Sequence, residues 1–221
     1  QTLRDCGLTN FRSQRKRLLW GYWNMKIDMI LLAAGNSRRF GSNKLFYEVD
    51  GIPLYLRAFD RLLAAAREGE NRIFVVSRYD EILAAAADRS PALIPVPSPD
   101  SGLGISRSIQ NGMAAAGCRT PDAPDALAFF VADQPWLLPE TIREFLDQYA
   151  ESGMPLGSLR LGERMGNPAV FSRSYYPELL ALSGDTGGRR ILNAHPEDCF
   201  CFSPGSVREL IDLDTPPEAD V

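Results

Sequence analysis

One stretch, from Asp28 to Leu45, constrains the fold more than any other part of the chain. It begins with a short apolar run, Met29 to Ala34, which ends at Gly35. An apolar run of this length, bounded by glycine, is typical of a strand that is buried on both faces of a parallel sheet. The pattern therefore predicts an α/β fold in which the first strand delivers a loop at its carboxyl end.

That loop has the composition of a phosphate-binding site. Gly35 and Gly41 permit tight turns and a close approach of the backbone to a ligand, and the cations Arg38, Arg39 and Lys44 lie near them. A Walker A loop requires lysine directly after the second glycine, and the dinucleotide fingerprint requires three glycines, so neither fits. The residues favour a polyphosphate held by a different loop. A strand followed by an ordinary basic surface turn is the simpler alternative.

The first half of the chain alternates predicted strands with predicted helices, which is the order found in a doubly wound parallel sheet, and the second half changes character. Apolar runs and helix signals predict strands at 72–77, 92–96, 126–132, 155–161, 167–171 and 200–201, and helices at 54–67, 81–89, 106–117, 139–150, 175–182 and directly after 189. The third strand is expected to stop at its prolines. No repeat or linker interrupts this order, so one domain is expected at 25–221.

Composition limits the class of protein. Hydrophobic residues make up 45% and charged residues 24% of the 221 residues, as in soluble globular proteins, and no apolar run could span a bilayer. The net charge of −4 divides into +4 over residues 1–24 and −8 over the remainder, and an acidic body argues against nucleic acid as a partner. Four scattered cysteines favour a reducing, cytoplasmic location. Cys199 and Cys201 are expected to pack in the core.

Residues 1–24 are predicted to be an N-terminal extension that is not part of the fold. They are basic, and their apolar end is too short for the hydrophobic region of a secretion signal. An inert extension is preferred to a docking arm or a membrane-surface contact through Trp20, Tyr22 and Trp23.

The run Leu32 to Lys44 resembles the Leu-Ala-Ala-Gly-x-Ser-x-Arg-Phe-Gly-x-x-Lys signature of the molybdenum cofactor cytidylyltransferase family, within the MobA-like nucleotidyltransferases. The resemblance implies a single-domain, Rossmann-like, mainly parallel twisted sheet with helices on both faces, of the nucleotide-diphospho-sugar transferase type. Residues 99–108 resemble a second family segment. Alone, their glycines and serines fit a capped helix equally well. Together the two segments imply nucleotide-binding residues Leu32, Ala33, Ala34, Gly35, Ser37, Arg39, Lys44, Ser101, Gly104 and Ser106.

Two aspartates are the expected ligands of Mg²⁺. Asp133 follows the most apolar predicted strand, where a carboxylate can ionise yet be held rigidly, as a magnesium ligand must be. Its Ala-Asp-Gln-Pro context resembles the metal-binding segment of the family, although a turn aspartate before proline is the common alternative. The ending Asp-Leu-Asp-Thr-Pro resembles another family segment, which makes Asp214 the second candidate ligand and Asp212 a weaker one.

The second substrate is expected to meet residues of the second half of the chain. Gly166, Asn167 and Pro168 resemble the Gly-Asn-Pro segment on the acceptor side of the family site, and Asp185 lies in a segment that resembles its Gly-Asp-x-Gly-Ala-Arg motif. On physical grounds alone, Asp185 could equally be a helix cap.

The resemblance implies transfer of CMP from CTP to the phosphate of molybdenum-loaded molybdopterin, with release of pyrophosphate, in molybdenum cofactor maturation. Arg39 would bind the triphosphate and Lys44 the α-phosphate. Cytidine is expected because guanylyl members carry a second glycine in place of Ala34. A molybdenum hydroxylase that receives the product is a candidate partner. The alternatives are another cytidylyl- or sugar-phosphate nucleotidyltransferase, and a non-catalytic molybdenum cofactor carrier.

Overall fold

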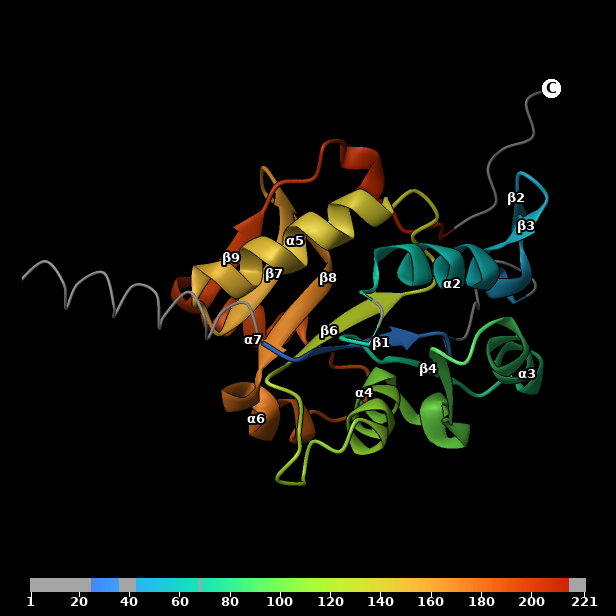
Figure 1. Ribbon diagram of the computed structural model, residues 1–221, viewed down its shortest axis with the longest axis horizontal. Coiled ribbons are helices and arrows are strands. Elements are labelled where there is room, and N and C mark those ends of the chain that lie inside the picture. The colour runs from blue at the N-terminus through green and yellow to red at the C-terminus, as the bar shows by residue number, and fades with distance from the viewer. Residues whose placement is uncertain (1–24, 36–42, 68, 215–221) are drawn as a thin grey trace, which may run out of the picture.

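The computed structural model describes residues 25–35, 43–67 and 69–214, and its centre is a seven-stranded sheet (Figure 1). The strand order is β5-β4-β1-β6-β8-β7-β9. Within this sheet, as far as the structure describes it, every neighbouring pair is parallel except the two pairs that β8 makes, with β6 and β7. The prediction of a mainly parallel sheet is therefore confirmed. The strands are β1 (Ile27–Leu32), β4 (Ile73–Ser77), β5 (Leu93–Pro97), β6 (Ala126–Val131), β7 (Leu156–Leu161), β8 (Arg164–Ser172) and β9 (Cys199–Phe202).

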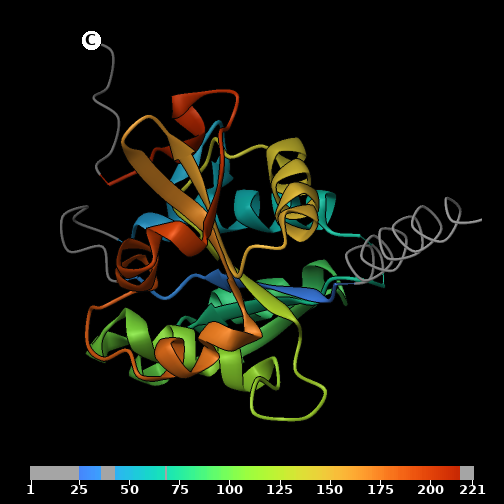
Figure 2. The same cartoon turned by 90° about the vertical axis from the view of Figure 1, so that its left-hand side faces the viewer.

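Helices cover both faces of this sheet, as Figures 1 and 2 show. One face carries α2 (Leu54–Ala65) and α5 (Pro139–Ser152), and α3 (Asp80–Arg89) extends the same core cluster toward β4 and β5. The other face carries α4 (Ile105–Ala115), α6 (Tyr176–Leu180) and α7 (Arg189–Ala194). Both faces of the central strands are thus buried, which explains why these strands are continuous apolar runs in the sequence.

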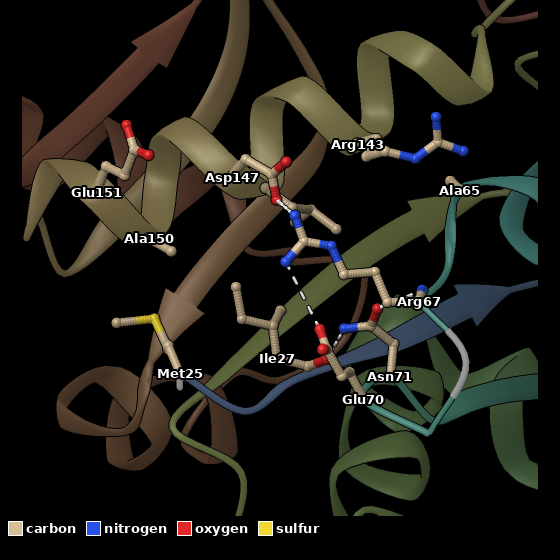
Figure 3. Close-up of a pocket in the computed structure, with 11 residues that line it drawn as sticks. Met25, Ile27, Ala65, Arg67, Glu70, Asn71, Arg143, Asp147, Ala150 and Glu151 are labelled. Atoms are coloured by element: carbon tan, nitrogen blue, oxygen red, sulfur yellow. Dashed lines mark hydrogen bonds and ion pairs between the residues drawn. The ribbon is translucent and has the colours of Figure 1, made fainter. Parts of the chain in front are cut away.

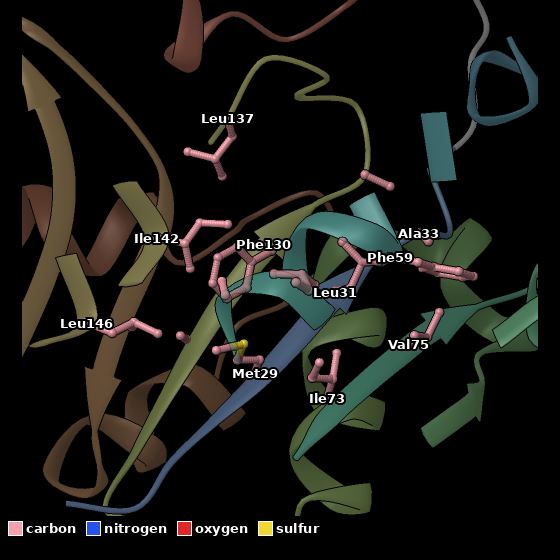
Figure 4. Packing of buried hydrophobic residues seen from close by; sticks show 14 of the residues in the cluster. Met29, Leu31, Ala33, Phe59, Ile73, Val75, Phe130, Leu137, Ile142 and Leu146 are labelled. Atoms are coloured by element: carbon pink, nitrogen blue, oxygen red, sulfur yellow. The ribbon is translucent and has the colours of Figure 1, made fainter. Parts of the chain in front are cut away.

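Alternation along β1 assigns its side chains to the two cores. Met29 and Leu31 belong to the cluster under α2 and α5, together with Phe59 and Phe130, and Figure 4 shows this packing. Ile30 belongs to the opposite cluster, under α4. All these side chains are almost completely buried, so β1 is the central support of the loop that follows it.

Short elements connect the main ones. After the first loop come η1 (Lys44–Phe46) and a small antiparallel hairpin of β2 (Glu48–Val49) and β3 (Ile52–Pro53). The segment before α4 is the 3₁₀ helix η2 (Pro99–Leu103). Three further 3₁₀ helices are η3 (Arg173–Tyr175), η4 (Pro196–Asp198) and η5 (Val207–Leu210).

The third predicted strand, 92–96, is present as β5, which ends at Pro97 and lies at the edge of the sheet, where a missing N–H is tolerated. The expectation about the other edge of the sheet was wrong. Cys201 is exposed and Cys199 only partly buried, because β9 is the other edge strand and its Phe200 and Phe202 face Phe145 of α5 instead.

No helix within residues 25–35, 43–67 or 69–214 has the length and apolar character needed to cross a bilayer. The predicted N-terminal extension, residues 1–24, lies outside the described residues.

Candidate active site

The strand order places a crevice at the carboxyl ends of β1 and β6. Strands β4 and β5 extend the sheet on one side of β1, and β6 extends it on the other. In doubly wound sheets this reversal of strand order is where ligands bind. A cavity of about 370 Å³ lies there, and Ala34 and Gly35 after β1 and Ala132 and Asp133 after β6 line it. We call it the first cavity.

Segments distant in sequence complete the walls of the first cavity. Lys44 and Leu45 come from η1, Ser101 and Gly102 from η2, and the loop before α7 contributes Asp185. The remaining lining residues are Leu32, Ile105, Ser108 and Val131. The cavity thus combines one cation, two carboxylates and hydroxyl groups with apolar walls.

A charged cluster lies at one end of the first cavity. Lys44 Nζ is 2.5 Å from Asp133 Oδ2 and 3.1 Å from Asp214 Oδ1, although 170 residues separate Lys44 from Asp214. Burial alone would lower the pKa of Lys44, but attraction to Asp133 and Asp214 outweighs it and the pKa is raised. Lys44 is therefore a cation at neutral pH, in contact with both predicted metal ligands.

Unsatisfied polar groups concentrate at the same place. Within the described part of the chain, four buried side-chain atoms have no hydrogen-bond partner, and they belong to Asn43, Ser101, Asp133 and Gln134. Ser101 and Asp133 line the first cavity, and Asn43 precedes Lys44. Since native proteins satisfy most buried polar atoms, such a group of exceptions marks a place where a ligand supplies the partners.

The carboxylates fit a divalent cation. Asp133 keeps its buried Oδ1 without a partner among the residues described, and carboxylate oxygens are the preferred ligands of Mg²⁺. Asp214 has a side chain that is 66% exposed and can adjust to an ion. Burial, with Asp133 next in importance, raises the pKa of the neighbouring Asp212, so these carboxylates repel one another. A cation would relieve that repulsion.

A second cavity, of about 250 Å³, adjoins the first and shares Leu32, Ile105 and Val131 with it. Strand β8 contributes Arg164 to Asn167. The loop before α7 contributes Gly187 and Gly188, and the helix itself Arg189. Asp212 and Gln134 are polar residues of the remaining wall. Its other residues are apolar: Ile109, Phe129, Ala169, Phe171, Leu179, Leu192 and Leu210.

The predicted nucleotide-binding residues are only partly at the first cavity. Leu32, Ala34, Gly35, Lys44 and Ser101 line it. Ala33 instead points into the core under α2, because alternation along the chain leaving β1 turns it to that face. Ser37 and Arg39 lie outside the described residues.

Gly104 and Ser106 contact another loop instead of the first cavity. The Ser106 side chain is buried, and its backbone N–H donates to the carbonyl oxygen of Gly184 at 3.2 Å. Gly104 has a φ of 127°, and a Cβ there would lie 2.2 Å from the Gly184 carbonyl carbon. These residues therefore fasten the start of α4 to the loop before α7.

This close approach predicts that Gly104→Ala lowers the free energy of unfolding by about 1–3 kcal/mol, because both the positive φ and the contact with backbone oppose a side chain. Urea denaturation measures it. Gly102→Ala is the matched control, since its Cβ would meet only Arg78 Nη1 at 3.5 Å, an ordinary contact. Equal stability of the two variants would contradict the role assigned to Gly104.

The predicted acceptor-binding residues are divided between the two cavities. Gly166 and Asn167 line the second cavity, whereas Pro168, next in β8, does not line it. Asp185, the remaining predicted acceptor-binding residue, lines the first cavity. The reason is that Gly184 is pressed against Gly104, which turns the start of the loop toward the first cavity and leaves Gly187 to Arg189 to line the second.

Sequence analysis missed several lining residues. Ser108 follows two other serines in the segment that the pattern already selected, so it could have been found. Arg164 is a basic residue in a glycine-containing turn, which is a weak signal. Gln134 stands next to Asp133, but nothing in its local sequence shows that it is buried.

A smaller cavity, of about 110 Å³, lies at the other end of β1, beside Met25 and Ile27 (Figure 3). Arg67 crosses it and pairs with Asp147 at 2.6 Å and with Glu70 at 3.6 Å. None of the unpartnered buried atoms found in the described ranges belongs to its lining. Arg67 is paired and Arg143 donates to the Ala64 carbonyl, so the first two cavities are the better candidate site.

Comparison with known families agrees with this location. A model of the MobA-like NTP transferase domain matches residues 29–199, which is about three quarters of the chain and includes both β1 and β6. The "Purine catabolism protein PucB" of Bacillus subtilis is 25% identical over 218 residues, covering 87% of this chain and 93% of that protein. The "Probable molybdenum cofactor guanylyltransferase" of Pyrococcus horikoshii is 53% identical over 38 residues, so the match spans 17% of this chain and only 20% of that relative.

Solved structures share the fold. Rv0371c from Mycobacterium tuberculosis superposes with a TM-score of 0.69 at 22% identity, covering 87% of this chain and 94% of that one. The 4-diphosphocytidyl-2C-methyl-D-erythritol synthase from Anaerococcus prevotii gives a TM-score of 0.65 at 14% identity, covering 89% and 93%. At these identities the likeness shows the fold alone, and it confirms the predicted nucleotide-diphospho-sugar transferase type.

Proposed function

The chain belongs to the MobA-like NTP transferase domain family, and from this premise we propose that it transfers CMP from CTP to the phosphate of molybdenum-loaded molybdopterin. Nucleotidyl transfer itself follows from the family. The observation that carries the proposal is the pair of adjoining cavities: Asp133 lines the first and Asp212 the second. Two substrates could therefore meet beside the carboxylates and Lys44.

In the proposed reaction, a phosphate oxygen of the acceptor attacks the α-phosphorus of CTP. A bond from that oxygen to phosphorus forms, the bond to the bridging oxygen breaks, and pyrophosphate leaves with the electron pair. A phosphate monoester has a second pKa of about 6 and is already mostly ionised at neutral pH, so no strong general base is required. The reaction therefore gives no role to His195, which caps the end of α7 and lies 3.4 Å from Glu178.

The chain's own groups would supply positioning and positive charge. Lys44 would neutralise the negative charge that develops on the α-phosphate, and Ser101 would donate its hydroxyl hydrogen to the nucleotide. Arg39 is the proposed ligand of the triphosphate, as the sequence resemblance implies. Asp133 and Asp214 would hold magnesium, which when bound would screen the charges of the two phosphate groups. Lys44 would thus stabilise the phosphate charge and the two carboxylates would bind the metal, and no histidine is needed.

The second cavity suits the proposed acceptor. Phe129 and Phe171 pack edge to face in its wall, with ring centroids 5.8 Å apart, and Leu192 adds apolar surface. Arg164 and Arg189 bring two cations to the same cavity, and Arg189 donates to the carbonyl of Met165. Apolar walls with a few cations fit a flat heterocycle that carries anionic groups, such as molybdopterin.

CTP is proposed on the resemblance of Leu32 to Gly35 to the cytidylyl signature, with Ala34 lining the first cavity. A specific observation keeps GTP as a second candidate, because a relative with 53% identity over its matched segment is named a guanylyltransferase. A molybdenum hydroxylase is the proposed recipient of the product, as the sequence resemblance implies. The proposed location is the cytoplasm.

The deciding experiment measures pyrophosphate release from CTP and from GTP with molybdenum-loaded molybdopterin, with methylerythritol phosphate, and without an acceptor. We expect release only from CTP with loaded molybdopterin, and mass spectrometry should find CMP joined to the pterin. Preference for GTP, or turnover with methylerythritol phosphate, would replace the proposed substrates. Tight binding of the cofactor without pyrophosphate from either nucleotide would favour the carrier alternative.

A further inference from the structure

The last described segment carries Asp214 to the cation site, where Lys44 Nζ donates to its carboxylate at 3.1 Å. Asp214 is mostly exposed and residues 211–214 belong to no helix or strand, so the backbone before it needs further support. Residues 208–213 run beside the loop 133–138 that follows β6. Four contacts join the two segments. Asp133 contacts Leu213, and Gln134 contacts Asp212. Trp136 contacts Arg208, and Leu138 contacts Glu209.

These contacts differ in their distance from Asp214. Arg208 lies over the Trp136 ring at 4.9 Å, and the Leu138 N–H donates to Glu209 Oε2 at 3.2 Å. Nearer to Asp214, the Leu213 N–H donates to the Asp133 carbonyl at 2.8 Å. In between, Gln134 Nε2 donates to Asp212 Oδ1 at 2.9 Å. Gln134 is thus the side chain of loop 133–138 that holds Asp212, whereas Leu213 packs against Leu54 and Lys44 contacts Asp214 itself.

Gln134 is built into the fold. Its side chain is 94% buried at the exit of β6, and its Oε1 has no partner in the part of the chain that the structure describes. It lines the second cavity together with Asp212. A buried amide has one orientation that suits its neighbours, so it can hold Asp212 more rigidly than an exposed side chain could.

The charges explain why an amide is needed here. The Asp212 carboxylate accepts from Gln134 Nε2, and Asp214, two residues further on, brings a second carboxylate to the same short segment. An N–H donor from Gln134 stabilises that carboxylate without adding charge. Glutamate would fill the same space but would place a further carboxylate against Asp212, and it would push the segment away from Asp133.

We propose that Gln134 is a positioning residue of the cation site: by holding Asp212, it keeps Asp214 within reach of Asp133 and Lys44. This inference rests on the proposed function in one respect only, the assignment of Asp133 and Asp214 to a divalent cation. It assigns Gln134 no contact with the cation or the nucleotide.

The test measures binding of Mn²⁺ to the whole chain by electron paramagnetic resonance, with and without a non-hydrolysable CTP analogue. We expect Gln134→Glu to weaken Mn²⁺ binding at least about tenfold, since a carboxylate replaces the donor that faces Asp212. Gln134→Met keeps the length of the side chain without the donor, and it should weaken binding less, about threefold to tenfold.

A double variant separates the hydrogen bond from other effects. In Gln134→Glu with Asp212→Asn, the amide donates to the carboxylate in the reverse direction, and we expect Mn²⁺ affinity to return to within about threefold of the parent. Gln148→Glu is the matched control, because it makes the same change on the exposed side of α5 and should leave Mn²⁺ binding unchanged. Thermal melting, followed by circular dichroism, checks that each variant is folded.

Three results would overturn the inference. Parent-like Mn²⁺ binding by both Gln134→Glu and Gln134→Met would remove the positioning role. Failure of the double variant to recover would mean that Asp212 is itself a ligand of the cation. Asp133→Asn, measured in the same assay, separates the proposed cation site from the positioning role of Gln134. If Asp133→Asn weakens Mn²⁺ binding and the Gln134 variants do not, only the positioning role fails. If the parent binds no Mn²⁺, the cation site fails and the positioning role with it.

Discussion

Lys44→Ala is expected to lower the turnover rate by about 10²- to 10³-fold while changing the dissociation constant of the nucleotide by less than about tenfold. The reason is the place of the ammonium group, in contact with Asp133 and Asp214 at one end of the first cavity. There it acts on charge that develops in the transition state, whereas other lining residues and the remaining phosphate contacts still bind the ground state.

Single-turnover kinetics and an independent measurement of nucleotide binding test this prediction. Lys26→Ala is the matched control, since Lys26 is an exposed lysine just before β1 and its replacement removes the same charge. It should leave both quantities unchanged. Losses of similar size in turnover and in nucleotide binding for Lys44→Ala would contradict a role confined to the transition state.

Asp133→Asn should reduce turnover by at least about a hundredfold at every Mg²⁺ concentration, and it should leave the melting temperature within a few degrees of the parent. Asparagine has nearly the same shape, and the backbone carbonyl that accepts from the Leu213 N–H is unaffected. Lys44 also keeps its second partner, Asp214, at 3.1 Å. The variant therefore removes a carboxylate ligand without removing the support of the site.

Turnover as a function of Mg²⁺ concentration, combined with a thermal melt, measures both parts of this prediction. Asp122→Asn serves as the control, because Asp122 lies in an exposed loop before β6. Activity close to that of the parent in Asp133→Asn would exclude Asp133 as the metal ligand. A large fall in melting temperature would instead show that its charge supports the fold.

The order of strands and helices could be read from the chain because each depends on local patterns. Continuous apolar runs identified the buried strands β1, β4 and β6 within one or two residues at each end. Local patterns failed at β9. The exposure of Cys201 depends on which strand is outermost, and that is a property of the whole sheet.

The candidate site was predicted only in part. Lys44 and Asp133 were chosen from the loops that follow apolar strands and from the resemblance of their segments to the family, Asp214 was chosen from the resemblance alone, and the structure brings these three together. The side of the site that Asp185 faces could not be predicted, because it depends on the approach of Gly184 to Gly104 across 80 residues.

The amino-acid sequence alone therefore determined the fold class and the identity of the charged residues, since periodicity and residue chemistry are local properties. The partners of Gln134 and Gly104 emerged only from packing, because each partner lies some 80 residues further along the chain. Contacts of that kind depend on how strands and loops are arranged in space, so they cannot be predicted from a residue's neighbours in sequence.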